Sequence, residues 1–471
     1  LVIRSVITKE FFMKEYRMKK ARFGIGARGG AAGIGFGAAL CAAVVFALVL
    51  TGCEFLQDFI GIGGTEPEEP EDISAKQAQA AAFSNGTEES GSVIDLIRAA
   101  VDESSLVIQL QPAASEGAEK VVLGVDDLPP GGFVLRHAGN TSLYPYTSPP
   151  EVTIDGGGMT VNLTGSAQGS LITVGAGVTL TLKNITFAGL DTAKDGSNDT
   201  ADNNAPLIKV EAYGYLILED NVVMQDNSNK GGAGGPGGGV LVSGTCTMNG
   251  GTISGNTYTS SGGGGVFLRG GTFIMNKGAV SGNSGASWGG GEGVFMETNS
   301  TFSMKGGTIS GSSAYGGVSV NSGSTFTMSG GEIRDNTSTN AARPGGVYVS
   351  GGSTFTMSGG EIRGNTATDY SSAGGVYVDG GGTFKMSGGT IRGNTAAGYR
   401  SAGGVYVIGA FIKDGGGIIY GDTDATPKND LEENNNTASG EEGGHAVYVH
   451  GDSPEIDSTL QEHDDFSIPA P

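Results

Sequence analysis

Gly346-Val347-Tyr348-Val349 is a segment that recurs along this chain, with near copies at 317–320, 375–378 and 404–407. The third residues of the four copies, at positions 319, 348, 377 and 406, are 29 residues apart each time. A second shared segment runs between the copies and reads TFTMSGGEIRGN at 354–365. A fixed period of about 20–50 residues predicts stacked structural units, none of which buries its own apolar face alone.

Within one unit, apolar residues alternate with small or polar ones, as where Val376 and Val378 flank Tyr377. Runs of this alternation predict short, half-buried strands. The Gly-Gly and Gly-Asn pairs between the runs supply the positive φ angles that tight turns need. Three strands and three turns in 29 residues leave no room for a helix. The sequence therefore predicts one coil of parallel strands per repeat, with coils stacked about 4.8 Å apart.

Stacking places equivalent residues of successive coils in columns. Each fully buried apolar side chain in such a column contributes roughly 1.5–3 kcal/mol. Asparagines recur at one turn, where stacked amides hydrogen-bond along the column, and Ser312 or Ser313 interrupts this column. The predicted columns are Phe273, Phe302, Phe326, Phe355 and Phe384; Met275, Met304, Met328, Met357 and Met386; Ile253, Val280, Ile309, Ile333, Ile362 and Ile391; and Asn256, Asn283, Asn336, Asn365 and Asn394.

These repeats resemble the right-handed parallel β-helix family with its pectin-lyase-like fold. The Gly-Gly-Val-Tyr-Val and Ile-Arg-Gly-Asn segments also resemble the repeats of polymorphic outer-membrane adhesins and of bacterial surface repeat lipoproteins, over roughly residues 150–450. The resemblance implies an all-β solenoid, a right-handed parallel β-helix of roughly ten coils with a short N-terminal capping helix. Many functions share this scaffold, so the resemblance does not choose among them.

The front of the chain resembles an export signal. Residues 1–17 are interpreted as an upstream extension, and Met18 begins a segment with basic residues followed by an apolar run from Gly29 to Leu50. The run ends in Leu50-Thr51-Gly52-Cys53, which is similar to the bacterial lipoprotein box. The resemblance implies a signal peptide at 18–52, a lipid on Cys53 and a location in the bacterial cell envelope, at the outer membrane or cell surface. The alternative is an uncleaved helix, since about 20 apolar residues span a bilayer.

The remaining segments follow from composition. Residues 53–90 hold clustered acidic residues interrupted by Pro67 and Pro70, followed by an alanine- and glutamine-rich stretch, which predicts a disordered tether. Residues 91–150 are expected to hold the N-terminal cap, with a helix at 92–101 and a strand at 104–110. The β-helix repeats take up 151–455, with loops expected at 189–204, 226–238 and 421–443, and 456–471 form a C-terminal tail.

Charge and cysteine content narrow the classes of partner. The formal net charge of −22 disfavours nucleic acid and anionic lipid as partners. It suits a soluble exported surface, cations or basic partners. The chain has three cysteines, and Cys246 stands at the phenylalanine position of its repeat, where we expect a buried apolar side chain rather than a disulfide.

The first candidate site is an aromatic stripe on the strands of the GVYV segments. Its rings stand between inward apolar residues and are therefore expected to face outward, where a column of flat rings stacks on sugars. The alternative is that the rings stack on one another and only cover the sheet. The stripe comprises Phe267, Phe295, Tyr348, Tyr377, Tyr406 and, at its end, Tyr448, and Ser319 interrupts it.

The second candidate is a charged column of Arg334, Arg363 and Arg392, which is expected to point outward in register. Three stacked guanidinium groups suit a uronate or a sulfate. The alternative is that Glu332 and Glu361 neutralise them, at about 0.2–1 kcal/mol per cross-strand pair.

Metal binding and catalysis are the less favoured interpretations. The loop with Asp191, Asp195, Asp199 and Asp202 has oxygen ligands but lacks the spacing of a calcium loop. Glycoside hydrolysis needs two carboxylates about 5–9.5 Å apart across a groove, and no paired-aspartate segment stands on a predicted strand. We therefore expect no metal site, no cofactor and no catalytic residue.

The sequence predicts a non-catalytic cell-envelope lipoprotein whose rigid β-helix face serves adhesion or glycan binding. The expected partners are the membrane, through the lipid, and a polysaccharide or a surface protein of a host or neighbouring cell. The alternatives are a polysaccharide lyase or glycoside hydrolase of the pectin-lyase-like fold, and a structural surface coat. Near-identical coils argue against a single catalytic place and favour many weak equivalent contacts.

Overall fold

The computed structural model describes residues 105–109, 133–135, 151–163, 168–191, 202–231, 235–260, 262–285, 291–414, 416–420, 436–438, 447–449 and 466–467. All regular elements in these ranges are strands. The expected signal peptide, Cys53, the tether and the capping helix at 92–101 lie outside the described residues. Within the described residues there is no helix of the length and apolar character needed to cross a membrane.

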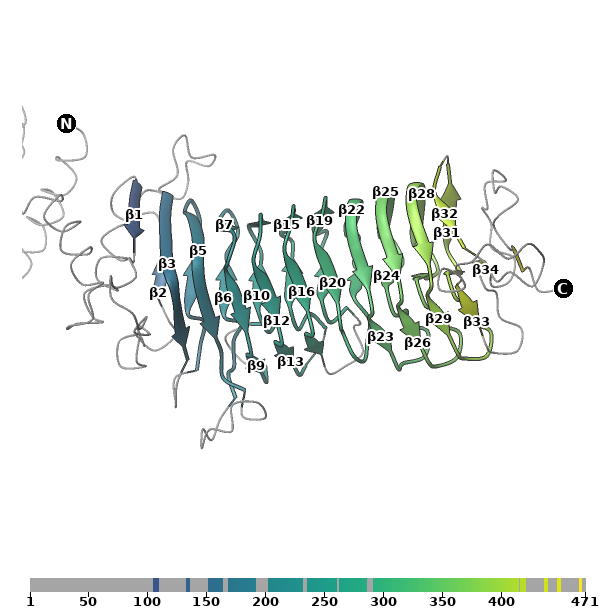
Figure 1. Cartoon of the computed structure of the whole chain (residues 1–471), viewed down its shortest axis with the longest axis horizontal. Helices are drawn as coiled ribbons and strands as arrows, with labels where there is room; N and C mark the ends of the chain where they lie inside the picture. The colour runs from purple at the N-terminus through teal and green to yellow at the C-terminus, as the bar shows by residue number, and fades with distance from the viewer. Residues whose placement is uncertain are drawn as a thin grey trace, which may run out of the picture. The chain divides into compact units, whose positions relative to one another are not determined.

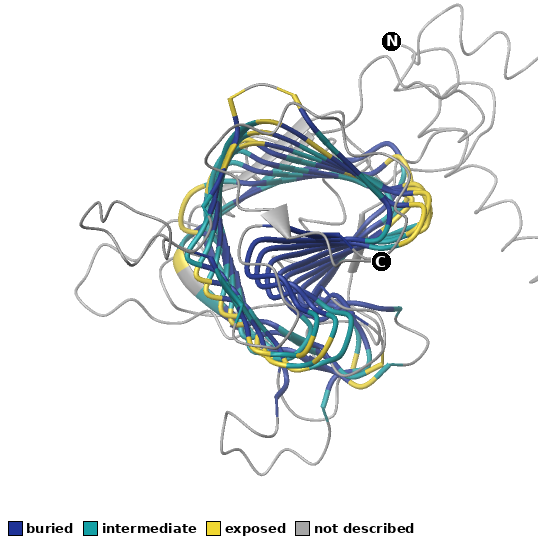
Figure 2. Ribbon diagram, turned by 90° about the vertical axis from the view of Figure 1, so that its right-hand side faces the viewer, coloured by how far each residue is buried: buried dark blue, intermediate teal, exposed yellow. Residues whose placement is uncertain are grey.

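The described strands form a parallel β-solenoid of about eight turns (Figure 1). The predicted all-β solenoid is confirmed, whereas the expected count of roughly ten coils and the helical cap are not. Seen along the solenoid, the coils superimpose, with buried residues lining the interior and exposed residues gathered at turns (Figure 2). The strands form three sides of the solenoid: sheet A, sheet B, and a third side made of the short sheets C and D.

Sheet A has 16 strands and carries the phenylalanine, methionine and isoleucine columns. In the most regular coils its two strands per coil merge into one long strand, with a register shift after the methionine. Its strands are β1 (Ser105–Gln109), β3 (Glu151–Asn162), β5 (Thr179–Ala188), β7 (Tyr215–Leu218), β8 (Val223–Gln225), β11 (Thr245–Met248), β12 (Thr252–Ser254), β15 (Thr272–Met275), β16 (Ala279–Ser281), β19 (Thr301–Met304), β20 (Thr308–Ser310), β22 (Thr325–Arg334), β25 (Thr354–Arg363), β28 (Thr383–Arg392), β31 (Ala410–Lys413) and β32 (Ile418–Ile419).

Sheet B has 12 strands and contains the GVYV segments. Every strand pairing within it is parallel, and Tyr348, Tyr377 and Tyr406 occupy equivalent positions. Its strands are β2 (Phe133–Leu135), β4 (Ile172–Val174), β6 (Ile208–Val210), β10 (Val240–Val242), β14 (Val266–Arg269), β18 (Val294–Glu297), β21 (Val318–Val320), β24 (Val347–Val349), β27 (Val376–Val378), β30 (Val405–Val407), β34 (Val447–Val449) and β35 (Phe466–Ser467).

The third side of the solenoid consists of two separate short sheets, sheet C with three strands and sheet D with four. Sheet C contains β9 (Ser228–Asn229), β13 (Thr257–Tyr258) and β17 (Ser284–Gly285), and sheet D contains β23 (Thr337–Ser338), β26 (Thr366–Ala367), β29 (Thr395–Ala396) and β33 (Thr437–Ala438). Strands β9 and β33 correct two expectations, because each lies in a segment that the sequence analysis assigned to a loop. The strand expected at 104–110 is confirmed by β1.

The predicted inward columns of the core are confirmed. Rings of the phenylalanine column are stacked, with neighbouring centroids 4.6–5.0 Å apart, and Phe411 extends the column by one coil. Cys246 lies in register with Phe273 and is completely buried, as expected. Burial raises the pKa of its thiol to about 12, so that Cys246 is an unreactive core residue.

One glycine column keeps the methionine column in place. Gly360 has a φ of 84°, and a Cβ atom at this position would lie 2.7 Å from the Cε atom of Met328 in the preceding coil. The same close approach recurs at Gly331 and Gly389. The second glycine of the Gly-Gly pair that follows each methionine is therefore required by its backbone conformation and by the preceding coil, where the Gly331 carbonyl oxygen would lie 2.8 Å from a Cβ atom at position 360.

Candidate functional site

The aromatic stripe lies on the outer face of sheet B, but its rings are not exposed. Tyr377 and Tyr406 stack with centroids 4.9 Å apart, and Tyr348 and Tyr448 extend the stack on either side at 5.7 and 5.1 Å. Phe267 and Phe295 form a separate pair at 4.9 Å. All six residues are buried, with exposed fractions of 1–7%. The expectation of exposed rings is corrected, and the alternative, that the rings stack on one another, describes the structure.

The segments that return from sheet D to sheet B cover the tyrosines. Ala373 and Ala402, which lie in these segments, pack against the tyrosine stack and complete a second small core outside sheet B. The Arg343 guanidinium lies 4.0 Å from the centre of the Tyr348 ring. As a result sheet B is buried on both faces in these coils, and the alternation of apolar residues along its strands does not distinguish a covered face from an open one.

The polar end of Tyr348 is satisfied inside the fold. The Tyr348 hydroxyl donates a hydrogen bond to the Asp379 carboxylate at 2.6 Å. Burial, together with this bond, raises the pKa of Tyr348 to about 12. Burial also raises the pKa of Tyr406 to about 12 and that of Tyr377 further. The folded protein therefore favours neutral tyrosines, and it loses this stabilisation as the pH rises above the ordinary tyrosine pKa.

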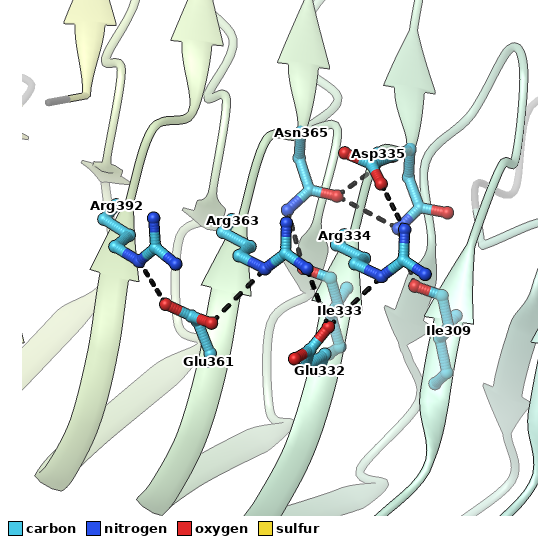
Figure 3. A network of polar contacts seen from close by, with 10 residues as sticks. Ile309, Glu332, Ile333, Arg334, Asp335, Glu361, Arg363, Asn365 and Arg392 are labelled. Atoms are coloured by element: carbon cyan, nitrogen blue, oxygen red, sulfur yellow. Dashed lines mark hydrogen bonds and ion pairs between the residues drawn. The ribbon is translucent and has the colours of Figure 1, made fainter. Parts of the chain in front are cut away.

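The arginine column is in register, as expected, and it is neutralised by neighbouring carboxylates (Figure 3). Arg363 lies 3.3 Å from Glu361 of its own strand and 3.0 Å from Glu332 of the preceding coil. Arg392 pairs with Glu361. Because each guanidinium faces at least one carboxylate, the structure favours the interpretation of a surface ion-pair ladder over that of a uronate or sulfate site.

Arg334 ends the ladder. Its Nε atom lies 3.1 Å from Glu332 as an ion pair without hydrogen-bond alignment, and its Nη1 atom lies 2.5 Å from Asp335. The arginine side chains of the ladder remain 30–36% exposed. They therefore add modest stability and leave no concentrated positive charge on this face.

The asparagine column is a buried hydrogen-bond ladder. Asn365 Nδ2 donates to the carbonyl of Ile333 (Figure 3). It also donates to Oδ1 of Asn394, and Asn365 Oδ1 accepts bonds from Asn336. The ladder continues beyond the predicted members to Asn203, Asn227 and Asn436. Asn203 and Asn436 were missed because they lie 24 and 42 residues from their neighbours in the ladder, which hides the spacing. Asn227 lies the usual 29 residues from Asn256, but in a segment that the sequence analysis assigned to a loop.

The predicted break in this ladder is confirmed at Ser312. The Ser312 backbone N–H donates to Asn336, but the buried Ser312 hydroxyl has no hydrogen-bond partner among the described residues. This coil is also shorter, because Val294 pairs with Val318 only 24 residues on. No third-side strand occurs in this coil, which the structure describes throughout, and sheets C and D are separate for this reason.

A buried carboxylate bridges the gap between the two sheets. Glu292 is completely buried and occupies a position at which the regular coils have glycine. Its Oε1 atom accepts a hydrogen bond from Gly285 N at 3.0 Å, and its Oε2 atom accepts bonds from Ser313 N at 2.6 Å and Ala314 N at 2.9 Å. Burial raises the pKa of Glu292, although these N–H donors act to lower it. Sequence reasoning missed Glu292. The feature that could have indicated it is a glutamate that replaces the first glycine of a repeated Gly-Gly pair, next to a coil of unusual length.

Two further aromatic residues were missed, and these are exposed. Tyr370 and Tyr399 lie 29 residues apart on the turns between sheet D and sheet B. Their exposed fractions are 58% and 47%, in contrast with the buried tyrosines of sheet B. Their common spacing was visible in the sequence, but a turn residue outside any alternating pattern gives no indication of where its ring points.

No metal centre is evident in the part of the chain that the structure describes. No group of three or more histidine, cysteine, aspartate or glutamate side chains is arranged there to hold an ion. Most of the aspartate loop after Asp191 lies outside this part. Comparisons with known protein families, with curated proteins and with solved structures found no match to this chain.

Proposed function

We propose that this chain is a non-catalytic, lipid-anchored protein of the bacterial cell envelope, whose rigid solenoid holds a surface for adhesion or glycan binding. The observation that carries the proposal is the repetition at 318–407. Three successive 29-residue steps place equivalent residues of sheet B in register, and two such steps do the same in sheets A and D. A scaffold of this kind presents several equivalent weak contacts to an extended partner. Together these contacts bind the partner more tightly than one contact alone does.

The envelope location is part of the same proposal and rests on the sequence. Leu50-Thr51-Gly52-Cys53 is similar to a lipoprotein box, and a segment with clustered acidic residues follows, which is expected to be a tether. The resemblance to right-handed pectin-lyase-like β-helices is compatible with this role but does not choose it, because many functions share that scaffold. The lipid is tested by labelled fatty acid incorporation, which the wild type shows and C53S lacks if Cys53 is the acceptor.

The function is tested with the purified full chain and a panel of insoluble plant and bacterial polysaccharides. We expect retention of the protein on at least one polysaccharide, without release of reducing or unsaturated ends. Release of such ends would replace the proposal with a lyase or hydrolase. Absence of both retention and release would leave protein adhesion or a structural coat.

A further inference from the structure

The break in the asparagine ladder buries a polar group without a protein partner. Ser312 is 2% exposed, and its Oγ atom makes no hydrogen bond with the described residues. A hydroxyl that leaves water without finding a new partner destabilises the folded state. In native structures such a buried group usually bonds to protein or to ordered water. A molecule bound beside Ser312 would therefore remove this cost.

The backbone of Ser312 keeps the position of an asparagine in the ladder. Ser312 N donates to Asn336 Oδ1 at 3.1 Å, and one coil further on Asn336 N donates to Asn365 Oδ1 at the same distance. Asn336 Nδ2 also donates to the carbonyl of Ile309, which lies in the same coil as Ser312. At this position the short coil therefore differs from the regular coils in its side chain and not in its backbone.

A serine at this position leaves polar groups of the preceding coil without their usual partner in the ladder. In the regular coils the asparagine Oδ1 atom accepts bonds from the N and Nδ2 atoms of the preceding asparagine. The asparagine Nδ2 atom donates to the carbonyl of an isoleucine in the preceding coil. The corresponding groups before Ser312 are the N and Nδ2 atoms of Asn283 and the carbonyl of Val280, which pairs with Ile309 in sheet A. The Ser312 hydroxyl bonds to none of them.

The place of the missing amide is not taken by another side chain. In the preceding coil a Cβ atom on Gly265 would lie 2.8 Å from Asn283 Nδ2, whereas at the equivalent Gly293 it would lie 3.6 Å from Ser312 Oγ. The closer neighbours of Gly293, a carbonyl oxygen and a side-chain carbon, have counterparts at Gly265. Glu292, which precedes Gly293, directs its carboxylate to backbone N–H groups of the third side. A serine lacks the carboxamide carbon and one of its polar atoms, so the short coil has room for a small molecule here.

We propose that the short coil binds a single water molecule between Ser312 and the preceding coil. The water accepts hydrogen bonds from Asn283 Nδ2 and Ser312 Oγ and donates one to the carbonyl of Val280. About three hydrogen bonds are typical of a buried water. The water and the serine hydroxyl together replace the two polar atoms of a carboxamide, and the polar ladder is thereby continuous through the short coil.

The mixture of donors and acceptors at the site selects water over an ion. Asn283 presents N–H donors, with which a metal or ammonium cation cannot pair. The Val280 carbonyl is an acceptor, with which an anion such as chloride cannot pair. Water both donates and accepts, so it satisfies both kinds of group. Collapse of the site without any bound molecule would leave these buried groups unpaired.

The first test compares crystal structures of the full chain as wild type and as S312N, at a resolution that shows ordered water. We expect the wild type to hold one water within about 2.7–3.2 Å of Ser312 Oγ, Asn283 Nδ2 and the Val280 carbonyl oxygen. S312N supplies the missing carboxamide. It should therefore lack the water, and Asn283 should donate directly to the introduced amide oxygen.

The matched variant N365S makes the reverse change in a regular coil. It removes the carboxamide to which Asn336 donates and which itself donates to the carbonyl of Ile333. Its structure should gain a water bonded to Asn336 Nδ2 and to the Ile333 carbonyl oxygen, as the wild type has at the short coil. If N365S does not fold, the wild type and S312N decide the question alone.

Four outcomes would overturn the proposal. The first is a wild-type structure in which Ser312 Oγ bonds directly to Asn283 or Val280 with no water between them. The second is density at the site that has the anomalous signal of a metal ion or of chloride. The third is a water that persists in S312N beside the carboxamide, since the water would then not occupy the place of the amide. The fourth is a folded N365S that gains no water.

Discussion

The regular coils at 318–407 and the single short coil at 291–317 share the same apolar core but differ in how the third side of the solenoid is built. In the first region every coil has 29 residues, a third-side strand and an asparagine in the buried ladder. The second region lacks the strand, has Ser312 in place of the asparagine, and closes the gap with the Glu292 carboxylate. In both regions the phenylalanine column is continuous, with Phe302 and Phe326 only 4.6 Å apart.

The difference shows that a coil can keep its apolar columns without having the usual third-side strand and asparagine. The core of the short coil is intact because strands β19 and β20 are still present. Only backbone groups on the third side lose their usual partners, and a charged side chain supplies replacements. A buried carboxylate costs more desolvation than a neutral amide, so this solution is the less stable one.

The largest expected effect tests whether the apolar core is packed equally well in the regular coils and in the short coil. F355A removes a ring between two stacked neighbours and should lower the free energy of unfolding by about 3–5 kcal/mol. Since the column is continuous, F302A in the short coil should cost about the same. Both are measured by denaturant unfolding, and a much smaller loss for F302A would mean that the short coil is loosely packed throughout.

The second prediction concerns the ladder itself. N365A leaves several buried hydrogen-bonding groups without a partner. It should lower the free energy of unfolding by roughly 3 kcal/mol, at the upper end of the penalty for a buried unsatisfied group. S312A is the matched change at the break, where the hydroxyl has no partner among the described residues, and it should be nearly neutral. Equal losses for the two variants would contradict the distinction between the regions.

The third prediction is a dependence of stability on pH, between acid and neutral values, that comes from Glu292 in the short coil. The raised pKa of Glu292 means that the folded state favours the protonated carboxyl, so this stabilisation is present at acid pH and is lost as the pH rises through the folded pKa. The wild type should therefore gain stability relative to E292Q as the pH falls from neutral toward the ordinary glutamate value. The measurement is the difference in denaturation midpoint at each pH, and E211Q, at a partly exposed turn, is the control.

The smallest effect belongs to the ion-pair ladder, which only the regular coils possess, since Ser310 stands at the arginine position of the short coil. R363A should lower the free energy of unfolding by about 0.2–1 kcal/mol, because the pairs are partly exposed. The loss should shrink in 1 M salt. A loss above that of N365A, or one unaffected by salt, would show that this column is more than a screened surface network.

Much of this architecture could be predicted from the sequence. The 29-residue period and the strand alternation correctly predicted the Phe326–Phe355 stack and the asparagine ladder with its break at Ser312. These features depend on contacts between residues one coil apart, and the fixed repeat reveals in the sequence which residues those are. The covering of Tyr377 could not be predicted, because alternation identifies the two faces of a strand but not what lies over each. Glu292 was missed because its partners come from segments whose lengths depart from the period.

The glycine that packs against the methionine of the preceding coil, together with the equal coil lengths, has a consequence for how this protein varies in size. Each coil contacts only its neighbours, so one further 29-residue copy inserted after Val378 would find every column already in register. The solenoid can therefore grow or shrink in steps of about 4.8 Å by duplication or loss of a segment. A change of one residue has the opposite result, since it exchanges the inner and outer faces of a strand. Length is thus a quantised property of this fold, and the near-identity of the coils keeps each step structurally neutral.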